Sequence, residues 1–460
     1  MDNRLDAVIS KLLSREKEWE SSWGKTEVDE TLQVDEASLN KTIDEFAERM
    51  KENYPFFHPR YAGQMLKPPH PIAAAAYAMA MQINPNNHAL DGGPATAKME
   101  VEVVSDLARM FGYGEHLGHL TTSGTIANLE ALWVARSLHP KKTIAYSHFA
   151  HYTHGRMCEV IGAESIEIPG DDAGRMDLQE LEKVLRSGKV GTVVATIGTT
   201  STGAVDRLEE IVPLCRRYGV RVHADAAYGG FFALLAHQKN PLIDAAPFLS
   251  LRDCDSIVVD PHKHGLQPYG CGCVLFKDSS VGKFYKHDSP YTYFTSKNLH
   301  LGEISLECSR PGAAAAALWF TLRCIPLMSD TGLGAILTKT RRAAIGFSDL
   351  NESGKAFAEF VKPELDIVTY FPRTTPFAAS RTSEASEKLF SAAMHHPTHP
   401  LYLAMFHANS AHVKRRHPSF QVDRDTTTIL RSVLMKPEHL AFVPKMYREL
   451  EGFSSSSSSV

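Results

Sequence analysis

One lysine, Lys263, lies between two apolar runs in the segment SIVVDPHKHGLQPYGCGCVLF, residues 256–276. Burial between core strands lowers the pKa of an amine, because the charged form loses its contact with water. A neutral amine can condense with an aldehyde, which is the activation that a Schiff-base lysine needs. A lysine at a strand end can instead be solvated and charged, and this segment alone leaves both interpretations open.

An acidic residue, Asp225, lies inside another apolar run, VRVHADAAYGGFF, residues 220–232. Carboxylates are seldom buried without a partner. A pyridinium nitrogen would be such a partner, because a buried anion keeps the ring protonated and makes it an electron sink. Ala226 and Ala227 offer a small surface on which a flat ring could lie. The alternative is a carboxylate that an arginine or backbone amides satisfy.

A possible anion site precedes a helical pattern in GHLTTSGTIANLEALWVAR, residues 118–136. A short apolar strand leads through Thr122, Ser123, Gly124 and Thr125 into this helix. The N–H groups and the dipole at a helix start favour an anion such as phosphate. Serine and threonine also cap ordinary helices, so this pattern is weak in isolation.

Three histidines, His148, His151 and His154, follow one another at spacings of three in AYSHFAHYTHGR, residues 145–156. Zinc is not expected here, because no cysteine or carboxylate is interleaved and no second cluster has matching spacing. An imidazole stacked on a cofactor ring is the better functional interpretation. Histidines exposed on a helix are the alternative.

The elements that must position these residues alternate between helical periods and short apolar runs from about Ala97 onward. The runs are IAYSHF, SIEIPG, TVVATIGTT, VRVHADAAYGG, SIVVDPHKH and CGCVLFKD. This alternation predicts an α/β fold with a largely parallel sheet covered by helices. Ligands of such sheets bind at the carboxyl ends of the strands, where all four pieces are expected to lie.

Four regions are expected along the chain. Residues 1–96 form an N-terminal helical arm, with helices around 5–19 and 37–50, and a segment that contributes to the substrate pocket. Residues 97–345 form the large domain, and residues 346–452 form a smaller domain that mixes helices and strands. Residues 453–460, rich in serine, are expected to be a disordered tail.

The composition excludes several classes of protein. The chain has 460 residues, 43% hydrophobic and 22% charged, as in globular proteins. A formal net charge of −4 and the lack of basic clusters argue against nucleic acid as a partner. No apolar run reaches the roughly 20 residues that cross a bilayer. The first 23 residues lack the pattern of a secretory signal, and the seven cysteines are expected to be reduced, so we expect a cytoplasmic protein.

Together, HADAAYGG and DPHKHG resemble the group II pyridoxal phosphate-dependent amino acid decarboxylases, which include the aromatic amino acid, tyrosine and glutamate decarboxylases. The resemblance covers roughly residues 54–322, with a continuation to about residue 450. It implies a fold type I homodimer with the active site at the subunit interface. It also implies pyridoxal 5'-phosphate as the cofactor and an amino acid, a small molecule, as the substrate.

The resemblance assigns roles residue by residue. Lys263 would form the Schiff base, Asp225 would pair with the pyridinium nitrogen, and His151 would stack on the ring and help to place the substrate. The remaining residues expected at the cofactor, mostly around its phosphate, are Thr122, Ser123, Gly124, Thr125, Thr200, Ala227 and His262. No metal is expected.

Two departures from the family pattern matter. The phosphate stretch usually reads Ser-Gly-Gly-Thr, whereas Ser123 here replaces one glycine. The tyrosine that returns a proton to the substrate carbon is not evident, and Tyr269, Tyr291 and Tyr293 are the candidates beside Lys263. The segment LECSRPG resembles the tyrosine decarboxylase pattern, which would put Ser309 and Arg310 near the dimer interface.

The predicted activity is decarboxylation of an L-amino acid to the amine and carbon dioxide. The alternatives are a carbon–carbon lyase, an aldehyde-forming relative, or a binding protein that has kept the fold and lost the chemistry. An aromatic substrate is favoured over an acidic or aliphatic one. The side-chain pocket is expected within residues 54–100, which offer Phe56, Phe57, Arg60, Tyr61, Lys67, His88 and Lys98.

Overall fold

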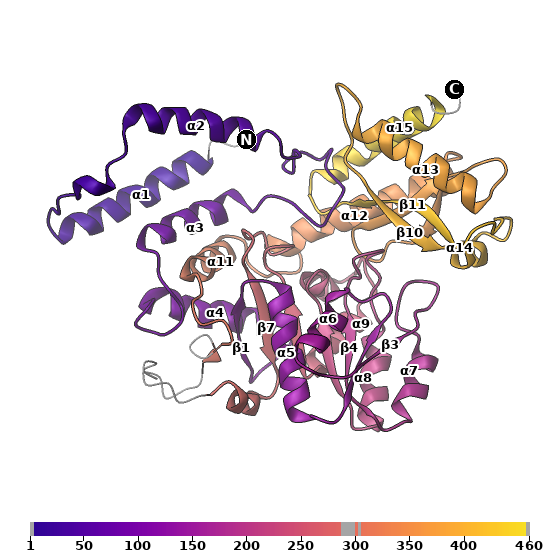
Figure 1. Ribbon diagram of the computed structural model, residues 1–460, viewed down its shortest axis with the longest axis horizontal. Helices are drawn as coiled ribbons and strands as arrows, with labels where there is room; N and C mark the ends of the chain where they lie inside the picture. The colour runs from indigo at the N-terminus through magenta and orange to yellow at the C-terminus, as the bar shows by residue number, and fades with distance from the viewer. Residues whose placement is uncertain (1–3, 287–299, 302–304, 457–460) are drawn as a thin grey trace.

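The computed structural model describes residues 4–286, 300–301 and 305–456, and it has three parts (Figure 1). A helical arm at the N-terminus leads into a large α/β domain. A smaller domain, drawn in orange and yellow, follows at the C-terminal end. Tyr291 and Tyr293, two of the candidate proton donors, lie outside the described residues.

The large domain is built on a seven-stranded sheet with the order β1-β7-β6-β5-β4-β2-β3. Neighbouring strands pair in parallel except where β7 runs against β1 and β6. The strands are β1 (Leu117–Thr121), β2 (Thr143–Ser147), β3 (Ser165–Ile168), β4 (Val190–Thr196), β5 (Arg221–Asp225), β6 (Ser256–Val259) and β7 (Gly272–Phe276). The predicted α/β fold with a largely parallel sheet is confirmed.

Helices cover both faces of this sheet, which explains why its strands read as nearly continuous apolar runs. In β7, Cys273 and Leu275 share a core with α4, whereas Val274 and Phe276 share a core with α5. The helices of this domain are α4 (Pro94–Met110), α5 (Gly124–Leu138), α6 (Thr153–Val160), α7 (Leu178–Leu185), α8 (Leu208–Arg217), α9 (Ala246–Leu249) and α11 (Gly312–Cys324). Short 3₁₀ helices are η2 (Gly230–His237), η3 (Ser250–Asp253) and η4 (Ser279–Phe284).

A four-stranded antiparallel sheet with the order β10-β11-β9-β8 forms the small domain. Its strands are β8 (Phe357–Val361), β9 (Ile367–Pro372), β10 (Ala404–Asn409) and β11 (Thr426–Val433), and its helices are α13 (Ala379–Met394), α14 (Ser410–Arg416) and α15 (His439–Ser456).

The long helix α12 (Gly332–Ser353) joins the two domains. Its first half packs into the large core through Leu333 and Leu337, and its second half packs into the small core through Ala344 and Phe347. The boundary expected between residues 345 and 346 therefore falls inside a helix that belongs to both cores.

The expected tail is partly helical, because α15 continues to Ser456. Phe453 extends the helix by packing against the small core, and its ring centroid lies 5.3 Å from that of His396. The expectation of disorder from residue 453 onward is therefore wrong for residues 453–456, and the last four residues lie outside the described part of the chain.

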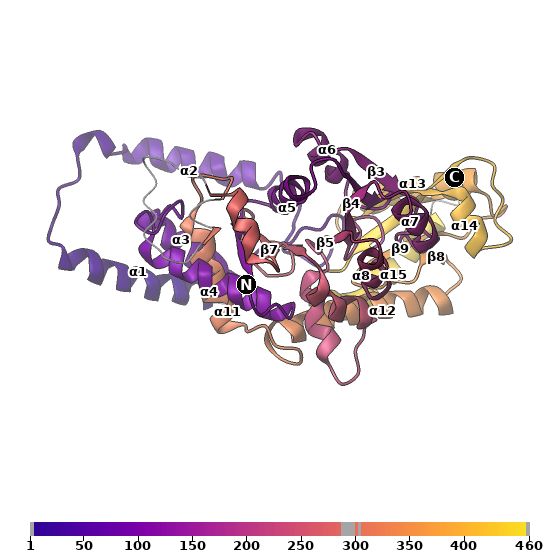
Figure 2. The same cartoon turned by 90° about the horizontal axis from the view of Figure 1, so that it is seen from below.

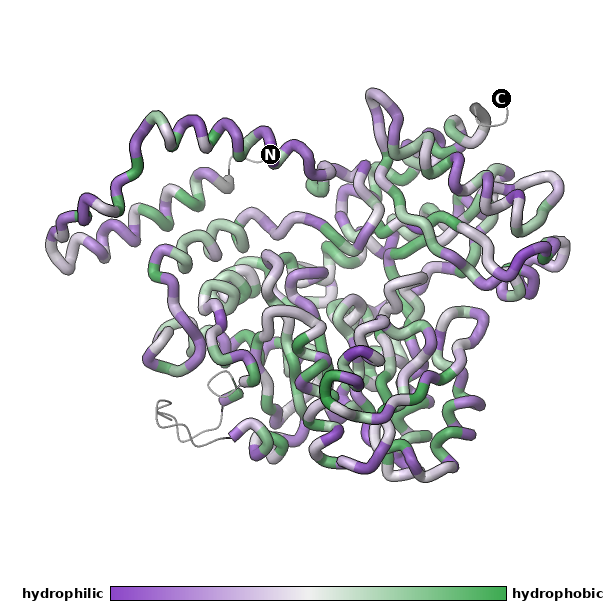
Figure 3. Tube along the Cα trace, viewed as in Figure 1, coloured by the Kyte–Doolittle hydropathy of each residue, from purple (hydrophilic) through white to green (hydrophobic). Residues whose placement is uncertain are grey.

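The arm consists of α1 (Arg4–Ser22), η1 (Glu30–Leu32), α2 (Glu36–Met50) and α3 (Pro71–Ile83). Asp35 caps α2 by accepting a hydrogen bond from the backbone N–H of Ser38, as its sequence indicates. Figure 2 shows α1 and α2 extending beyond the large domain, and Figure 3 shows that both carry hydrophobic as well as hydrophilic residues. Apolar side chains such as Trp23, Leu32 and Phe46 are exposed on the arm. Within the described residues, no helix combines the length and apolarity needed to cross a membrane.

Candidate active site

A cavity of about 210 Å³ lies at the carboxyl edge of the large sheet. Its walls come from segments that follow β1, β2, β4, β5 and β6, so parallel strands bring together residues that are far apart in the chain. The lining residues are Ser123, Gly124, Thr125, Asn128, His151, Thr153, Thr196, Gly198, Thr200, Asp225, Ala227, Tyr228, Asp260, His262 and Lys263. Nine residues expected from the sequence are among them: Ser123, Gly124, Thr125, His151, Thr200, Asp225, Ala227, His262 and Lys263.

Asp225 is the last residue of β5 and is buried. Its Oδ2 accepts a hydrogen bond from His154 Nε2 at 2.8 Å, and its Oδ1 accepts one from the backbone N–H of Ala227 at 3.2 Å. Burial by itself would raise the pKa of Asp225, but the hydrogen bond and charge of His154 and the charge of Lys263 bring it below its ordinary value. The carboxylate is therefore held as an anion in the cavity wall.

Lys263 is less enclosed than its sequence context indicates. Its side chain is 22% exposed, and its Nζ lies 3.1 Å from Asp260 Oδ2. Asp260 directly follows β6 and is itself buried, so the amine faces a fixed carboxylate. The amine is therefore neither enclosed by apolar side chains alone nor fully solvated, because the carboxylate of Asp260 lies three residues earlier on the same turn.

His262 is held by its own turn. Its Nδ1 donates a hydrogen bond to the carbonyl oxygen of Cys271 at 2.7 Å, and burial lowers the pKa of the ring. The ring of Tyr269 lies 4.9 Å from the ring of His262, centroid to centroid. Tyr269 does not line the cavity: it is 56% exposed, and its Oη lies 3.5 Å from the carbonyl oxygen of Met65. It stands at the outer side of His262.

The anion site expected from the sequence corresponds to the start of α5. Ser123 caps this helix, and its Oγ accepts a hydrogen bond from the backbone N–H of Ile126 at 3.3 Å. The φ of Ser123 is −167°, which is extended backbone open to any residue, so the departure from the family glycine causes no strain. A Cβ on Gly124 would lie 2.6 Å from both carboxylate oxygens of Asp260, so this position requires glycine.

Thr122 is not part of the cavity. It is exposed, and its backbone N–H donates to Glu307 Oε2 at 3.0 Å, while its hydroxyl donates to Glu307 Oε1. The expectation that Thr122 holds the phosphate is therefore wrong for this conformation, because the carboxylate of Glu307 already accepts hydrogen bonds from its backbone N–H and its hydroxyl.

The three evenly spaced histidines have three different surroundings. His148 is exposed and pairs with Glu167, whereas His154 is buried against Asp225. His151 lines the cavity, its Nδ1 lies 2.8 Å from Thr153 Oγ1, and burial lowers the pKa of its ring. Their different directions leave only His151 to face a bound group.

Among the described residues that line the cavity, none comes from the segment 54–100. Arg60 pairs with Glu449 of the small domain, Lys98 is exposed, and the buried Lys67 donates to the carbonyl oxygen of Met435. These side chains fasten the arm or face solvent, so the expected substrate pocket is not formed by them in a single chain.

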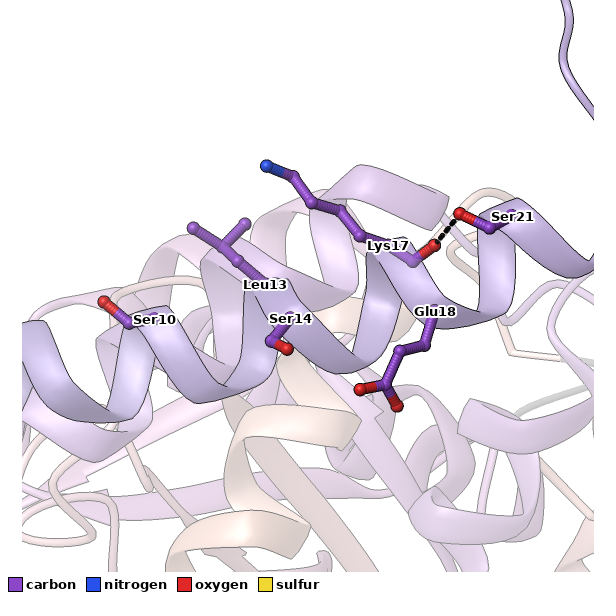
Figure 4. Close-up of a pocket in the computed structure, with 6 residues that line it drawn as sticks. All are labelled: Ser10, Leu13, Ser14, Lys17, Glu18 and Ser21. Carbon is purple, nitrogen blue, oxygen red and sulfur yellow. Dashed lines mark hydrogen bonds between the residues drawn. The ribbon is translucent and has the colours of Figure 1, made fainter.

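A larger hollow of about 770 Å³ lies along α1, and Figure 4 shows its side chains. All of its lining residues come from this one helix: Ser10, Leu13, Ser14, Lys17, Glu18 and Ser21. In the close-up these side chains do not converge on a point, and the one interaction drawn is between Ser21 and the backbone of Lys17. This surface is an open helix flank without the grouped donors and acceptors of an active site.

Several cavity residues were not expected from the sequence, namely Asn128, Thr153, Thr196, Gly198, Tyr228 and Asp260. Asp260 had a visible signal, because it follows an apolar strand directly before the lysine turn. Tyr228 stands three residues after Asp225. Asn128 and Thr196 carry no signal of their own, because their side chains reach the cavity only through the packing of α5 and β4.

The cavity fits a flat cationic ring that carries an aldehyde and a phosphate. A buried anion, Asp225, and an amine, Lys263, stand in its walls, and the first turn of α5 contributes backbone N–H groups without partners inside the helix. Oδ1 of the buried Asp260 has no hydrogen-bond partner among the described residues. These features match the donors and acceptors of pyridoxal phosphate.

Comparison with known proteins supports this match. Residues 24–370 match the model of the pyridoxal-dependent decarboxylase conserved domain. The chain is 28% identical over 411 residues to L-tyrosine decarboxylase of Enterococcus faecium, covering 68% of this chain and 67% of that protein. It is 30% identical over 314 residues to the probable L-tyrosine/L-aspartate decarboxylase of Methanothermobacter thermautotrophicus, covering 68% and 82%.

The fold is also similar to a solved structure, that of Oryza sativa TDC with PLP and tryptamine. The TM-score is 0.78, with 18% sequence identity and 99% of each chain covered. The chain therefore belongs to the pyridoxal-dependent decarboxylase family, and it is a pyridoxal phosphate-dependent carboxy-lyase that acts on an amino acid.

Proposed function

We propose that this chain decarboxylates an L-amino acid, with an aromatic side chain favoured, to the amine and carbon dioxide, and that Lys263 and Asp225 are its central catalytic residues. The observation that carries the proposal is that one cavity holds the amine of Lys263 and the anionic carboxylate of Asp225. The bound cofactor supplies an electron sink for the pair left behind when the carboxylate departs as carbon dioxide.

The residues around the cavity have distinct proposed roles. Asp225 keeps positive charge on the ring nitrogen through the transition state, where charge stabilisation by a preorganised group contributes most. His151 would lie against the ring, and the start of α5 with Ser123, Gly124 and Thr125 would hold the phosphate together with His262. Thr200 and Ala227 would pack beside the ring. The contact of Lys263 with Asp260 fixes the amine before the cofactor arrives.

The experiment that tests the proposal is borohydride reduction of the cofactor-loaded protein, followed by peptide mapping. The label is expected on the peptide that contains Lys263, and Lys263→Ala should abolish both the label and turnover. Asp225→Ala should reduce turnover severely while the label on Lys263 remains. A label on another lysine would contradict the proposal.

Lys263 is also the proposed donor of the proton that replaces the lost carboxylate, since its amine lines the cavity. Tyr269 is the second candidate, although its Oη points toward Met65. Tyr269→Phe separates the two: unchanged amine production supports Lys263, whereas aldehyde formation or a large loss of amine identifies Tyr269. Analysis of products for amine, aldehyde, carbon dioxide, ammonia and peroxide also separates decarboxylation from the lyase and aldehyde-forming reactions.

An acidic substrate is the second candidate, and one observation favours it. Arg431 on β11 is buried, and its contacts are long ones, from Nη2 to the carbonyl oxygen of Gly63 and to Gln64 Oε1, rather than an ion pair with a carboxylate of the described residues. Its charge acts on Tyr228, which lines the cavity. The names of the relatives include both tyrosine and aspartate. Carbon dioxide release from each of the twenty amino acids decides between them, and Arg431→Met should abolish release from an acidic substrate only.

A homodimer with the active site at the subunit interface is part of the same proposal. The exposed apolar side chains of the arm support it, since monomeric proteins rarely leave such a surface uncovered. Phe46→Glu should shift the mass measured by light scattering toward the monomer, whereas Lys41→Glu on the same helix should not. A wild-type protein that is already monomeric would contradict the dimer.

The seven cysteines are free thiols, which supports a reducing, cytoplasmic location.

A further inference from the structure

Three buried side chains from separate parts of the chain meet directly behind the cavity. Tyr228 Oη donates a hydrogen bond to Asp366 Oδ1 at 2.6 Å. The other oxygen of this carboxylate, Oδ2, lies 3.3 Å from His264 Nε2. Tyr228 and His264 belong to the large domain, whereas Asp366 directly precedes β9 of the small domain. One carboxylate therefore contacts two residues across the domain boundary.

Both large-domain residues are next to central residues of the site. Tyr228 follows Asp225 by three positions and lines the cavity, while its hydroxyl points away to Asp366. His264 directly follows Lys263, and its ring centroid lies 4.8 Å from that of Tyr228. Phe232 packs against His264 from another side, with ring centroids 5.1 Å apart. Asp366 therefore contacts Tyr228, whose ring is part of the cavity wall, and His264, which belongs to the turn that carries Lys263.

Asp366 is itself held firmly in the small domain. Its carbonyl oxygen accepts a hydrogen bond from the backbone N–H of Leu434 at 2.8 Å. The preceding carbonyl, that of Leu365, accepts one from Arg341 Nη1 of α12 at 2.9 Å. The side chain is fully buried, and burial raises the pKa of Asp366 to about 6, although Tyr228, Lys67 and Thr340 oppose this shift. A buried acid with this anchoring sets the position of whatever it contacts.

We propose that Asp366 is a positioning residue for decarboxylation, which from the small domain holds the ring of Tyr228 in the cavity wall and, through His264, the turn that carries Lys263. This inference rests on the proposed function and deepens it. It makes the placement of the small domain a determinant of cavity shape, although Asp366 does not itself line the cavity.

The step from position to rate is steric. Without Asp366 the hydroxyl of Tyr228 would be buried without an acceptor, so the ring would turn to find another partner. Because the ring is part of the wall, its rotation changes the space in which the substrate must be aligned. Displacements of about 1 Å in such a wall can cost on the order of 100-fold in rate.

The test uses the cofactor-loaded full chain and compares four single variants and one double variant. Asp366→Ala removes both contacts. Asp366→Asn keeps an acceptor for Tyr228 at nearly the same size, and Tyr228→Phe removes only the hydroxyl. Glu364→Gln is the matched control, because Glu364 pairs with Arg175 across the same domain boundary without contacting the cavity. For each variant, kcat, KM, the rate of cofactor release and the midpoint of thermal unfolding are measured.

Asp366→Ala is expected to lower kcat/KM by about 10- to 100-fold and to speed cofactor release, while Asp366→Asn stays within about threefold of wild type. The double variant Asp366→Ala with Tyr228→Phe should be no worse than Asp366→Ala, because both changes act on one contact. Glu364→Gln should leave all kinetic parameters unchanged.

Two outcomes would overturn the inference. If Glu364→Gln matches Asp366→Ala, the effect is one of domain docking; if the effects of Asp366→Ala and Tyr228→Phe multiply, the two residues act independently. Should Asp366→Ala fail to fold, the comparison of Tyr228→Phe with Asp366→Asn still decides, because the inference requires a loss of kcat/KM in the first that is absent in the second. Borohydride labelling of wild-type Lys263 tests the proposed function separately, so the two failures are distinguishable.

Discussion

His154 Nε2 donates a hydrogen bond to Asp225 Oδ2 at 2.8 Å, and both side chains are buried. His154 Nδ1 has no hydrogen-bond partner within the described residues, so among these residues it is Nε2 that makes the hydrogen bond of this ring, to Asp225. The backbone N–H of Ala227 donates a hydrogen bond to the other oxygen of Asp225. The carboxylate is thus oriented from two sides, and the imidazole beneath it acts through Asp225 rather than on a bound ring directly.

Removing this support should weaken the cofactor site. We expect His154→Ala to lower kcat by roughly 10- to 100-fold and to weaken retention of pyridoxal phosphate, because Asp225 loses a donor that fixes its orientation. His154→Gln, whose amide can donate to the same oxygen, should recover part of the loss. Activity and cofactor release measured side by side check this.

The matched control is His148→Ala, since His148 is an exposed histidine six residues earlier that pairs only with Glu167. It should leave both quantities unchanged. Equal activity of His154→Ala and wild type would show that the backbone N–H alone is enough to hold Asp225.

A second buried pair, Glu100 with Arg310, should make the free energy of unfolding depend on pH. Burial alone would raise the pKa of Glu100, but the charge and hydrogen bonds of Arg310, with smaller contributions from His300 and Asn87, lower it to about 2. A carboxyl whose folded pKa is below its unfolded value contributes stability that is present above the unfolded pKa. That stability is lost as the pH falls from about 4.5 through about 2, and it amounts to on the order of 3 kcal/mol.

Glu100→Gln should therefore lower the urea midpoint of unfolding most at neutral pH, and the difference from wild type should shrink below about pH 4.5. Glu102, on the same helix as Glu100, is an exposed carboxylate that pairs with Arg323 of α11, and Glu102→Gln should show little effect at any pH. A difference between Glu100→Gln and wild type that does not change with pH would contradict the assignment.

Much of the fold follows from the sequence because the strands of a doubly covered sheet must be apolar along their whole length. The runs that end at Thr121, Asp225 and Val259 therefore marked strands, and parallel pairing then brought their carboxyl ends to one edge. Local patterns of this kind predicted most of the cavity.

Contacts made by distant side chains were not predictable in the same way. His154 looked like one of three equivalent histidines, and only the fold brings its side chain from α6 to Asp225 at the end of β5. Thr122 was predicted to be a phosphate ligand, but its donors form hydrogen bonds to Glu307, which lies 185 residues later. Lys67 was one of several residues offered for the substrate pocket, but its amine donates to the carbonyl oxygen of Met435, 368 residues later.

Replacing Ser123 by the glycine that is usual in the family should be nearly neutral. Its extended φ requires no glycine, and its side chain contributes one capping hydrogen bond at 3.3 Å. Exchanging a serine cap for glycine typically costs a few tenths of a kcal/mol. Ser123→Gly should therefore retain cofactor affinity and activity within about twofold of wild type, as measured by titration with pyridoxal phosphate and by amine production. A large loss of affinity would mean that the Ser123 hydroxyl binds the phosphate directly.

The next residue should behave in the opposite way. Gly124→Ala would place a Cβ 2.6 Å from both carboxylate oxygens of Asp260, and Asp260 is the residue that contacts the amine of Lys263. Since a buried carboxylate cannot give way without losing that contact, we expect cofactor affinity to fall by at least about tenfold and turnover to fall with it.

Gly346→Ala is the matched control, because Gly346 lies within α12 and its added Cβ would meet nothing within 4 Å. That change should leave the cofactor affinity unchanged and stabilise the helix slightly, since alanine favours helix more than glycine does by about 1 kcal/mol. If Gly124→Ala binds pyridoxal phosphate as tightly as Gly346→Ala does, Asp260 does not stand against the start of α5 when the cofactor is bound, and the arrangement of the anion site must differ from the one described.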